Sequence, residues 1–227
     1  MQNLFAVVLA SVTLVAQVPG PAPTVLPATA SVRLMESFKA ASAFREHTWR
    51  DISPFVGNLV NGYIEIPMGE LTKYEFDMGT NTRKVDRVMP ESLGGYPINY
   101  GYVPQTVSYD GDPFDVLVLG PALPGGELVQ GVIVGLMLME DEKGLDSKVV
   151  ISPVDENGKA KYALTPQDQA RIGEYFNAYK ANDSDPKTWS KVPGWGTAED
   201  GLSYVRTTAA FFQQCRVHTD RPCLVVL

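Results

Sequence analysis

The chain has 227 residues, 44% of them hydrophobic and 20% charged, as is usual for a soluble globular protein with a buried core and one catalytic domain. Its 26 acidic and 19 basic residues give a net charge of -7, which argues against a nucleic acid bound over a broad surface. A small anion held at one place remains compatible with this charge.

The amino-terminal segment is apolar. Its first 32 residues carry no charged side chain, and the apolar run Leu4–Ala16 is too short to span a bilayer. Prolines and the small-residue pattern Ala28-Thr29-Ala30 follow, as expected near a signal-peptidase cleavage site. We predict a signal peptide over residues 1–30 and a secreted or periplasmic protein with no stable membrane association after leader removal. The alternative is an apolar arm on a cytoplasmic protein.

Residues 31–55 are expected to form an N-terminal arm, in which Glu36–Arg50 has the mixed polarity of a short helix or an ordered segment. Short apolar runs separated by Gly, Pro and Asp then predict strands within a catalytic domain over residues 56–215. Such spacing favours a small β-barrel. The predicted strands are Tyr63–Ile66, Thr72–Phe76, Val116–Leu119, Val129–Met139 and Lys148–Ile151.

The longest of these runs, Val129–Met139, is apolar on both faces, which predicts a strand buried on both sides. Strict alternation places Val134 on the face of Leu136, and Met137 on the opposite face.

Two helices are predicted after the strands. The first has Thr165 as its N-cap and Pro166 at its first helical position, and the second begins at Thr197 with acidic residues in its first turn. The segment Trp189–Trp195 between them is predicted as a loop rich in Pro and Gly. The order of elements predicts an α+β fold, a small closed OB-like β-barrel with helices packed against it.

Only two cysteines occur, Cys215 and Cys223, and the second lies in the predicted tail, residues 216–227. Two thiols alone do not form a zinc site. In an exported protein they are expected to form a disulfide, and in a cytoplasmic protein they are expected to be free thiols.

A dense acidic segment, Asp110–Val116, contains three carboxylates within six residues, directly before an apolar strand. Like charges this close raise each other's pKa unless a cation lies among them, and a hard cation with oxygen ligands meets that need. The spacing does not fit an EF-hand, because Pro121 stands where that loop requires Glu. The alternative is an exposed acidic turn.

A second acidic segment, Glu140–Lys148, connects the long strand to the next one. A solvated hairpin tip is its default interpretation. If both acidic loops lie at strand ends of one barrel, they can face a common cavity and supply ligands for several magnesium ions. Basic and phenolic residues are interleaved with these acids, and such groups suit phosphoryl oxygens.

The sequence resembles family I soluble inorganic pyrophosphatases from about residue 55 to residue 212. Asp110–Asp115 fits that family's D-x-D-x-x-D signature, which is a specific motif. Further matching segments, in the same order as in the family, are Ile64–Pro67, Lys73–Glu75, Val85–Arg87, Tyr96–Pro97, Asn99–Tyr102, Asp141–Lys148, Tyr179–Lys180 and Gly194–Trp195.

The resemblance implies a role for each matching residue. Asp112 is expected to take a proton from a water bridging metal ions. The expected Mg2+ ligands are Glu65, Asp110, Asp115, Asp141 and Asp146. The residues expected to hold or surround pyrophosphate are Lys73, Glu75, Arg87, Tyr96, Tyr100, Lys148, Tyr179 and Lys180.

The expected reaction is magnesium-dependent hydrolysis of pyrophosphate by direct attack of water, in a homo-oligomer. The sequence offers no convincing activated Ser or Cys nucleophile. Two alternatives stay open: a metal phosphohydrolase acting on a larger phosphoanhydride such as a nucleotide, although the sequence lacks a P-loop, and a calcium- or phosphate-binding module without catalysis.

Overall fold

The computed structural model describes residues 27–181, 187–217 and 223. Most of the predicted signal peptide lies outside these residues, and its last three positions, 28–30, form the start of helix α1 (Ala28–Ala41). Within the described parts of the chain, every helix is too short or too polar to cross a membrane.

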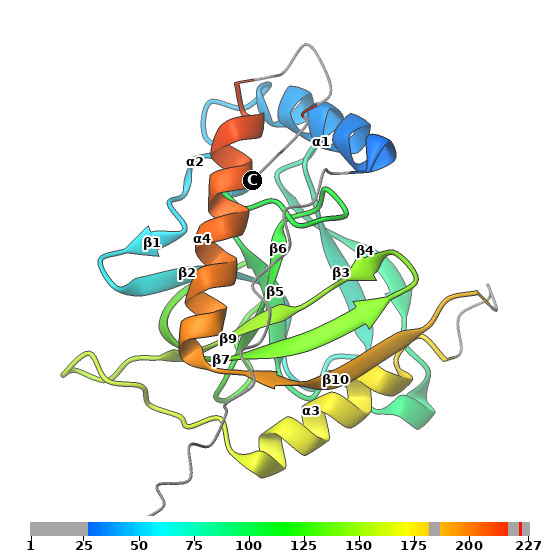
Figure 1. Ribbon diagram of the computed structural model, residues 1–227, viewed down its shortest axis with the longest axis vertical. Coiled ribbons are helices and arrows are strands. Elements are labelled where there is room, and N and C mark those ends of the chain that lie inside the picture. Colours follow the sequence, from blue (N-terminus) through cyan, green and yellow to red (C-terminus); the bar gives the residue numbers. More distant parts are fainter. Residues whose placement is uncertain (1–26, 182–186, 218–222, 224–227) are drawn as a thin grey trace, which may run out of the picture.

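Five strands form a closed ring. Each is hydrogen-bonded to the next in the order β2 (Leu59–Ile66), β5 (Asn99–Val103), β6 (Phe114–Val118), β9 (Lys148–Pro153) and β7 (Leu128–Asp141), and β7 pairs back with β2 (Figure 1). All of these pairs are antiparallel except β6 with β9. A ring leaves no free edge among its members. The predicted α+β fold with a small closed barrel is confirmed.

Other strands extend the ring. The strands β1 (Phe55–Val56), β8 (Gly144–Leu145) and β10 (Ser190–Gly196) pair with β2 or β7. The hairpin of β3 (Thr72–Asp77) and β4 (Thr82–Val88) forms a separate two-stranded sheet.

All five predicted strands are present, but the loop predicted at Trp189–Trp195 is wrong, because most of it forms β10. This strand lies at the end of the sheet order, where Pro193 removes no obligatory hydrogen bond. A register shift between Lys191 and Gly194 accommodates the proline. The Pro and Gly therefore mark an irregular edge strand.

The strict alternation predicted for β7 is also wrong. Val134 packs with Met137 in one core cluster, whereas Leu136 and Ile133 pack in another. The cause is a register shift between Ile133 and Gly135 opposite β9, which moves the following side chains to the other face. The prediction that both faces of this strand are buried holds for its second half, where Leu136 and Met137 have no exposed surface.

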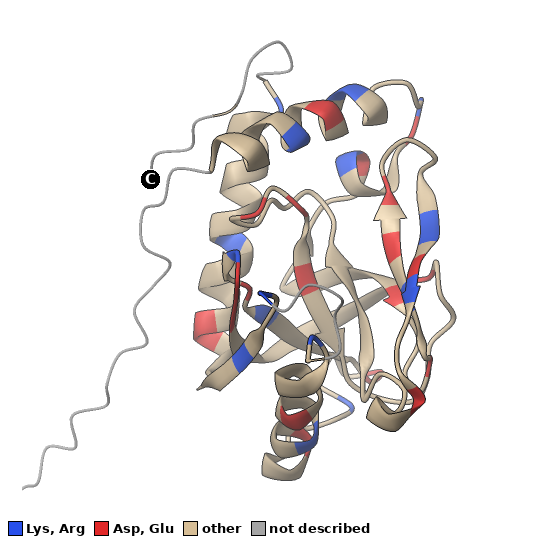
Figure 2. Cartoon of the chain, turned by 90° about the vertical axis from the view of Figure 1, so that its right-hand side faces the viewer, with Lys and Arg blue, Asp and Glu red and all other residues tan. Residues whose placement is uncertain are grey.

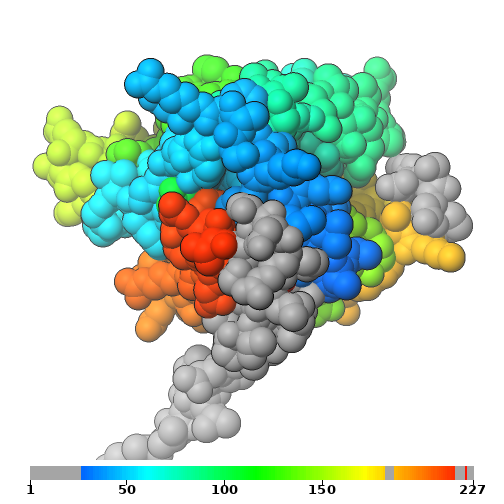
Figure 3. Space-filling view, turned by 90° about the horizontal axis from the view of Figure 1, so that it is seen from above, coloured from blue at the N-terminus to red at the C-terminus, as the bar shows by residue number. Residues whose placement is uncertain are grey.

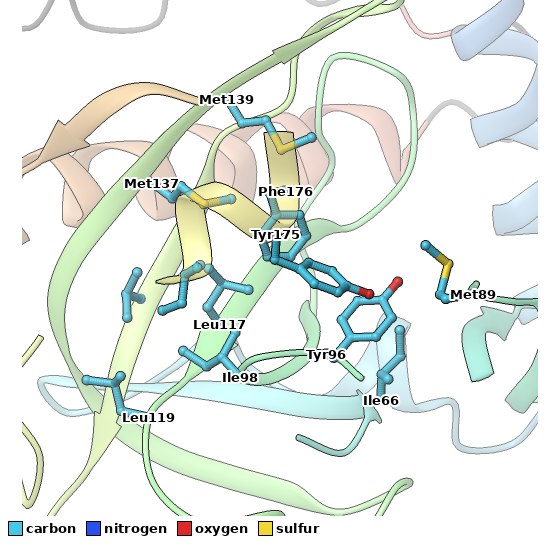
Figure 4. Close-up of a cluster of buried hydrophobic side chains, with 12 residues drawn as sticks. Ile66, Met89, Tyr96, Ile98, Leu117, Leu119, Met137, Met139, Tyr175 and Phe176 are labelled. Atoms are coloured by element: carbon cyan, nitrogen blue, oxygen red, sulfur yellow. The ribbon is translucent and has the colours of Figure 1, made fainter. Parts of the chain in front are cut away.

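The helices α3 (Pro166–Ala178) and α4 (Ala198–Cys215) begin where the sequence predicts. Thr165 and Thr197 are their N-caps, and each forms a reciprocal capping box with an Asp three residues later. Helix α4 packs on β7 and β9. Helix α3 inserts Ile172, Tyr175 and Phe176 into a core cluster with Met137 and Met139 of β7 (Figure 4).

The expected N-terminal arm folds as α1, followed by α2 (Thr48–Asp51). Leu34 and Phe38 of α1 pack against Phe212 near the end of α4. Figures 1 and 3 show α1 beside this end of α4. The Ser31 hydroxyl donates a 2.7 Å hydrogen bond to the carbonyl oxygen of Cys223.

A disulfide joins Cys215, the last residue of α4, to Cys223. Both side chains are buried in the same core cluster as α1. The bridge is the state expected for an exported protein, and it ties the tail to the helix pair.

Replacing both cysteines by Ser should lower the unfolding temperature by about 5–10 °C, because a bridge closing so short a segment contributes about 2–3 kcal/mol. Calorimetric melting of both proteins, with and without a thiol reductant, measures the effect. Reductant should destabilise only the unsubstituted protein. Equal melting of the two proteins without reductant would show that the bridge contributes nothing.

Candidate active site

The two acidic loops open into one cavity of about 630 Å³. Its walls also include the β3–β4 hairpin, residues just after α3, and one face of α1. Acidic and basic residues lie interspersed around this region (Figure 2). Every residue that the sequence assigns to the site lines the cavity, except Tyr96 and Lys148. The lining residues are Glu65, Lys73, Glu75, Arg87, Tyr100, Asp110, Asp112, Asp115, Asp141, Asp146, Tyr179 and Lys180.

The aspartate loop, defined here as Asp110–Asp115, is a tight turn. The amide of Ser108 donates to the carbonyl oxygen of Asp112 at 2.7 Å, and the amide of Asp112 donates to Oδ1 of Asp110 at 3.1 Å. Gly111 has φ of +89°, a conformation that side chains rarely adopt. These bonds hold Asp110 and Asp112 at the loop tip, while Asp115 lies on β6.

Lys148 lies beneath the cavity and is 1% exposed. Its Nζ is 2.6 Å from Oδ2 of Asp115 and 2.9 Å from Oδ1 of Asp146. Burial lowers the pKa of Lys148, but the two carboxylates raise it further, so the net shift is upward and the ammonium keeps its charge. This buried cation joins the two acidic loops.

Lys180 makes an analogous bridge from the segment after α3. Its Nζ is 2.7 Å from Oδ2 of Asp141 and 2.9 Å from Oε1 of Glu142. The C-cap residue of α3 is Tyr179, so the end of the helix places both side chains at the cavity.

Lys73 on β3 is the third such cation. Its Nζ is 2.6 Å from Oε1 of Glu75 and 3.0 Å from Oδ2 of Asp86 on β4. Although burial lowers the pKa of Lys73, these two carboxylates raise it above its usual value. Each of the three lysines thus touches two carboxylates, which leaves every ammonium with alternative partners.

Several acids in the cavity resist ionisation. Burial raises the pKa of Asp110 to about 7, and the neighbouring charge of Asp112 adds to the shift. Burial also raises the pKa of Asp146 to about 7, where Asp115 opposes ionisation and Lys148 favours it. Burial and Asp115 hold the pKa of Glu65 well above its usual range. The cavity therefore carries more carboxylate than its own cations neutralise.

This donor set fits a hard divalent cation such as Mg2+ by its chemistry, because carboxylate oxygens are hard ligands. The pKa values of Asp110, Asp146 and Glu65 are raised, and a nearby cation would favour the ionised form of each. Among the residues described, no group of three acidic side chains already forms a set of metal ligands. Lys148 and Lys180 lie against four of the carboxylates instead. Ion binding thus requires side-chain rearrangement.

Tyr96 lies behind the cavity wall with 1% of its surface exposed. Its ring packs 5.7 Å from that of Tyr100 and 5.1 Å from that of Tyr175, in the cluster of Figure 4. It therefore supports the cavity-lining Tyr100 from within the core.

Seven charged residues at the cavity were not assigned to the site from the sequence: Arg33, Glu36, Asp77, Lys84, Asp86, Glu142 and Lys143. Two of them form ion pairs with assigned lysines: Asp86 pairs with Lys73, and Glu142 pairs with Lys180. Asp86 adjoins Arg87, and Glu142 adjoins Asp141, so their positions beside assigned residues were a usable signal. Arg33 comes from α1, and nothing in its local sequence connects it with the aspartate loop.

A closed OB-like barrel whose cavity interleaves carboxylates with buried lysines defines a hydrolase site suited to a small phosphate-containing anion. Residues 62–213 match the protein family described as inorganic pyrophosphatase. The chain belongs to that family, within its family I soluble branch, and is an inorganic diphosphatase, an enzyme that hydrolyses pyrophosphate.

Individual relatives agree with this membership. The inorganic pyrophosphatase of Thermus thermophilus is 39% identical over 170 residues, which are 72% of this chain and 94% of the relative. A crystal structure of inorganic pyrophosphatase from Thermus thermophilus matches with a TM-score of 0.66 and 34% identity, over 73% of this chain and 99% of that one. The structure of an inorganic pyrophosphatase from Coxiella burnetii matches with a TM-score of 0.65 and 38% identity, over 71% of this chain and 99% of that one.

In the metal-free protein, stability should fall as pH rises from about 4 to about 8. Asp110 and Asp146 have raised pKa values when folded, so the folded state binds their protons more tightly and loses that advantage as they ionise. Asp146→Asn should therefore raise the melting temperature at pH 8 in chelator by about 3–6 °C and leave it nearly unchanged at pH 4. Calorimetry at both pH values measures this, and equal shifts would contradict the interpretation.

Proposed function

We propose that this hydrolysis of pyrophosphate depends on magnesium and proceeds by direct attack of water, with no covalent phosphoenzyme. The observation that carries the proposal is the convergence of both acidic loops, Lys73 and Lys180 on one cavity, with Lys148 paired beneath it to Asp115 and Asp146. Pyrophosphate is a compact polyanion, so its site needs cationic donors for phosphate oxygens and a means of balancing the remaining charge.

The proposed ligands of Mg2+ are Glu65, Asp110, Asp115, Asp141 and Asp146. When bound, the ion supplies charge neutralisation and a more acidic attacking water. The protein's contribution is the placement of these oxygens: Glu65 and Asp141 are each only 7% exposed, so both are held within the wall.

The proposed phosphate-holding groups come from three separate elements. Lys73 and Arg87 lie on the β3–β4 hairpin, Lys148 begins β9, and Tyr179 and Lys180 follow α3. Glu75 and Tyr100 are proposed to line the substrate site, and Tyr96 to act through Tyr100. Lys73 and Lys180 line the cavity and each touches two acidic groups, so each can exchange a carboxylate for a phosphate oxygen without crossing the cavity. Lys148 is 1% exposed and can contact phosphate only after its carboxylate partners move.

Asp112 is the proposed proton acceptor. It lies at the tip of the aspartate loop, and 55% of its side chain is exposed to the cavity, so it can reach a water there. Protein around the cavity displaces bulk water and raises the pKa of Asp112, while Arg33 acts in the opposite direction. A carboxylate with a raised pKa is a stronger base than an ordinary aspartate.

We further propose that the protein is exported, as secreted or periplasmic, which the Cys215–Cys223 bridge supports. A homo-oligomer is proposed from the family resemblance. The acidic net charge supports the proposal that no nucleic acid is a partner.

Phosphate release from pyrophosphate should require magnesium. The purified protein is assayed with Mg2+, with Ca2+ and with neither, and then with both ions together. We expect release with Mg2+ alone and inhibition by Ca2+, because the larger ion tolerates irregular coordination that does not hold the reactants in place. A folded protein that binds either ion but releases no phosphate would instead be a binding module.

Asp112→Asn should lower kcat by at least about 100-fold and leave the melting temperature within about 2 °C, because the amide keeps the shape but cannot accept a proton. Steady-state kinetics and calorimetry measure these effects. Glu156→Gln, the same chemical change at an exposed residue far from the cavity, is the matched control and should keep full activity. Near-normal turnover by Asp112→Asn would remove Asp112 from the mechanism.

A further inference from the structure

Helix α1 contributes one of its faces to the cavity. Arg33, Glu36, Ser37 and Ala40 recur at helical spacing and line it. The neighbouring face of α1, which includes Leu34 and Phe38, is buried in the core cluster shared with the end of α4. The helix lies outside residues 62–213, the part matched to the family.

The first turns of α1 touch three consecutive residues of the aspartate loop. Nη1 of Arg33 is 3.6 Å from Oδ2 of Asp112, and Nη2 of Arg33 donates to the carbonyl oxygen of Asp110. A Cβ on Gly111 would lie 2.7 Å from the carbonyl oxygen of Ala30, so the helix backbone packs directly on the loop. The planar guanidinium of Arg33 thus contacts the backbone carbonyl of Asp110 and the side-chain carboxylate of Asp112.

These contacts are poorly explained as a device for global stability. The side chains of Arg33 and Asp112 are 47% and 55% exposed, and ion pairs as exposed as this one contribute little to the free energy of unfolding. Their effect on geometry is direct, because they add contacts from α1 to a loop tip that also has its own internal hydrogen bonds. The helix that carries Arg33 is held in place by its packing in the core cluster and by the Ser31–Cys223 hydrogen bond.

We propose that Arg33 is a positioning residue for hydrolysis: supplied by α1, it holds the aspartate loop and directs the carboxylate of Asp112 toward the reacting water. The inference rests on the proposed role of Asp112 as proton acceptor. It assigns α1 and the disulfide-bonded tail to the active site, as the support that keeps Arg33 in place.

The test compares Arg33→Gln and Arg33→Lys with Lys39→Ala, a matched control that removes one charge from an exposed position on the same helix, away from the cavity. Arg33→Gln should lower kcat by about tenfold with KM for pyrophosphate within about twofold, because misplacing a reacting group affects turnover rather than substrate binding. Arg33→Lys should be intermediate, since an ammonium cannot reproduce the two-point contact. Lys39→Ala should match the unsubstituted enzyme.

A second readout needs no turnover. Amide hydrogen exchange of the metal-free protein should become about tenfold faster across the aspartate loop in Arg33→Gln, and should not change in Lys39→Ala. The proposal is overturned by unchanged exchange and kinetics, by a rise in KM alone, which would make Arg33 a substrate ligand, or by a rise in kcat, which would make it a competing counter-ion. If the unsubstituted protein does not hydrolyse pyrophosphate, the proposed function fails, and the exchange experiment still decides whether Arg33 holds the loop.

Discussion

The repulsion among carboxylates that share one cavity is the constraint on which the rest of this site depends. Burying a carboxylate without a partner is costly, and burying several together is more so. Lys148 reduces this cost, because its buried ammonium lies within 2.9 Å of both Asp115 and Asp146. Burial outweighs the effect of this ammonium and raises the pKa of Asp146 to about 7, and the charge of Asp115 adds to the shift. A site of this kind favours the binding of additional positive charge. Without that charge, its ionised carboxylates repel one another.

The barrel provides the positions that make this balance possible. The one parallel pair of the ring, β6 with β9, aligns Val116 with Val149, so Asp115 and Lys148 stand side by side at the same end of neighbouring strands. Antiparallel neighbours would have placed these starting residues at opposite ends. The same end of the ring receives the connection between β7 and β9, and with it Asp141 and Asp146. One change of strand direction thus brings residues of two distant loops together.

Much of the fold and most of the site were predictable from the sequence, for identifiable reasons. Caps such as Thr165 are local signals, and the spacing of Asp110, Asp112 and Asp115 is a short motif that can be read directly from the sequence. The edge strand β10 and the register shift in β7 escaped prediction because pairing with a neighbour, not local propensity, decides them. The position of Arg33 at the site could not be predicted for the same kind of reason, since tertiary packing alone brings α1 to the aspartate loop. Lys148 was identified as a site residue, yet its burial beneath the cavity follows from the β6–β9 pairing.

The hydrogen bond between Ser31 and Cys223 joins residues 192 positions apart. Four buried residues in the core cluster of α1 are also made late in synthesis: Phe211, Phe212, Cys215 and Cys223. The contacts of α1 with these late residues can form only after almost the whole chain is synthesised, and contacts of such long sequence separation form slowly. The barrel can close earlier, from strands that are complete by residue 153. All five strands of the ring are thus synthesised before the residues of α4 and Cys223 that complete the packing of α1.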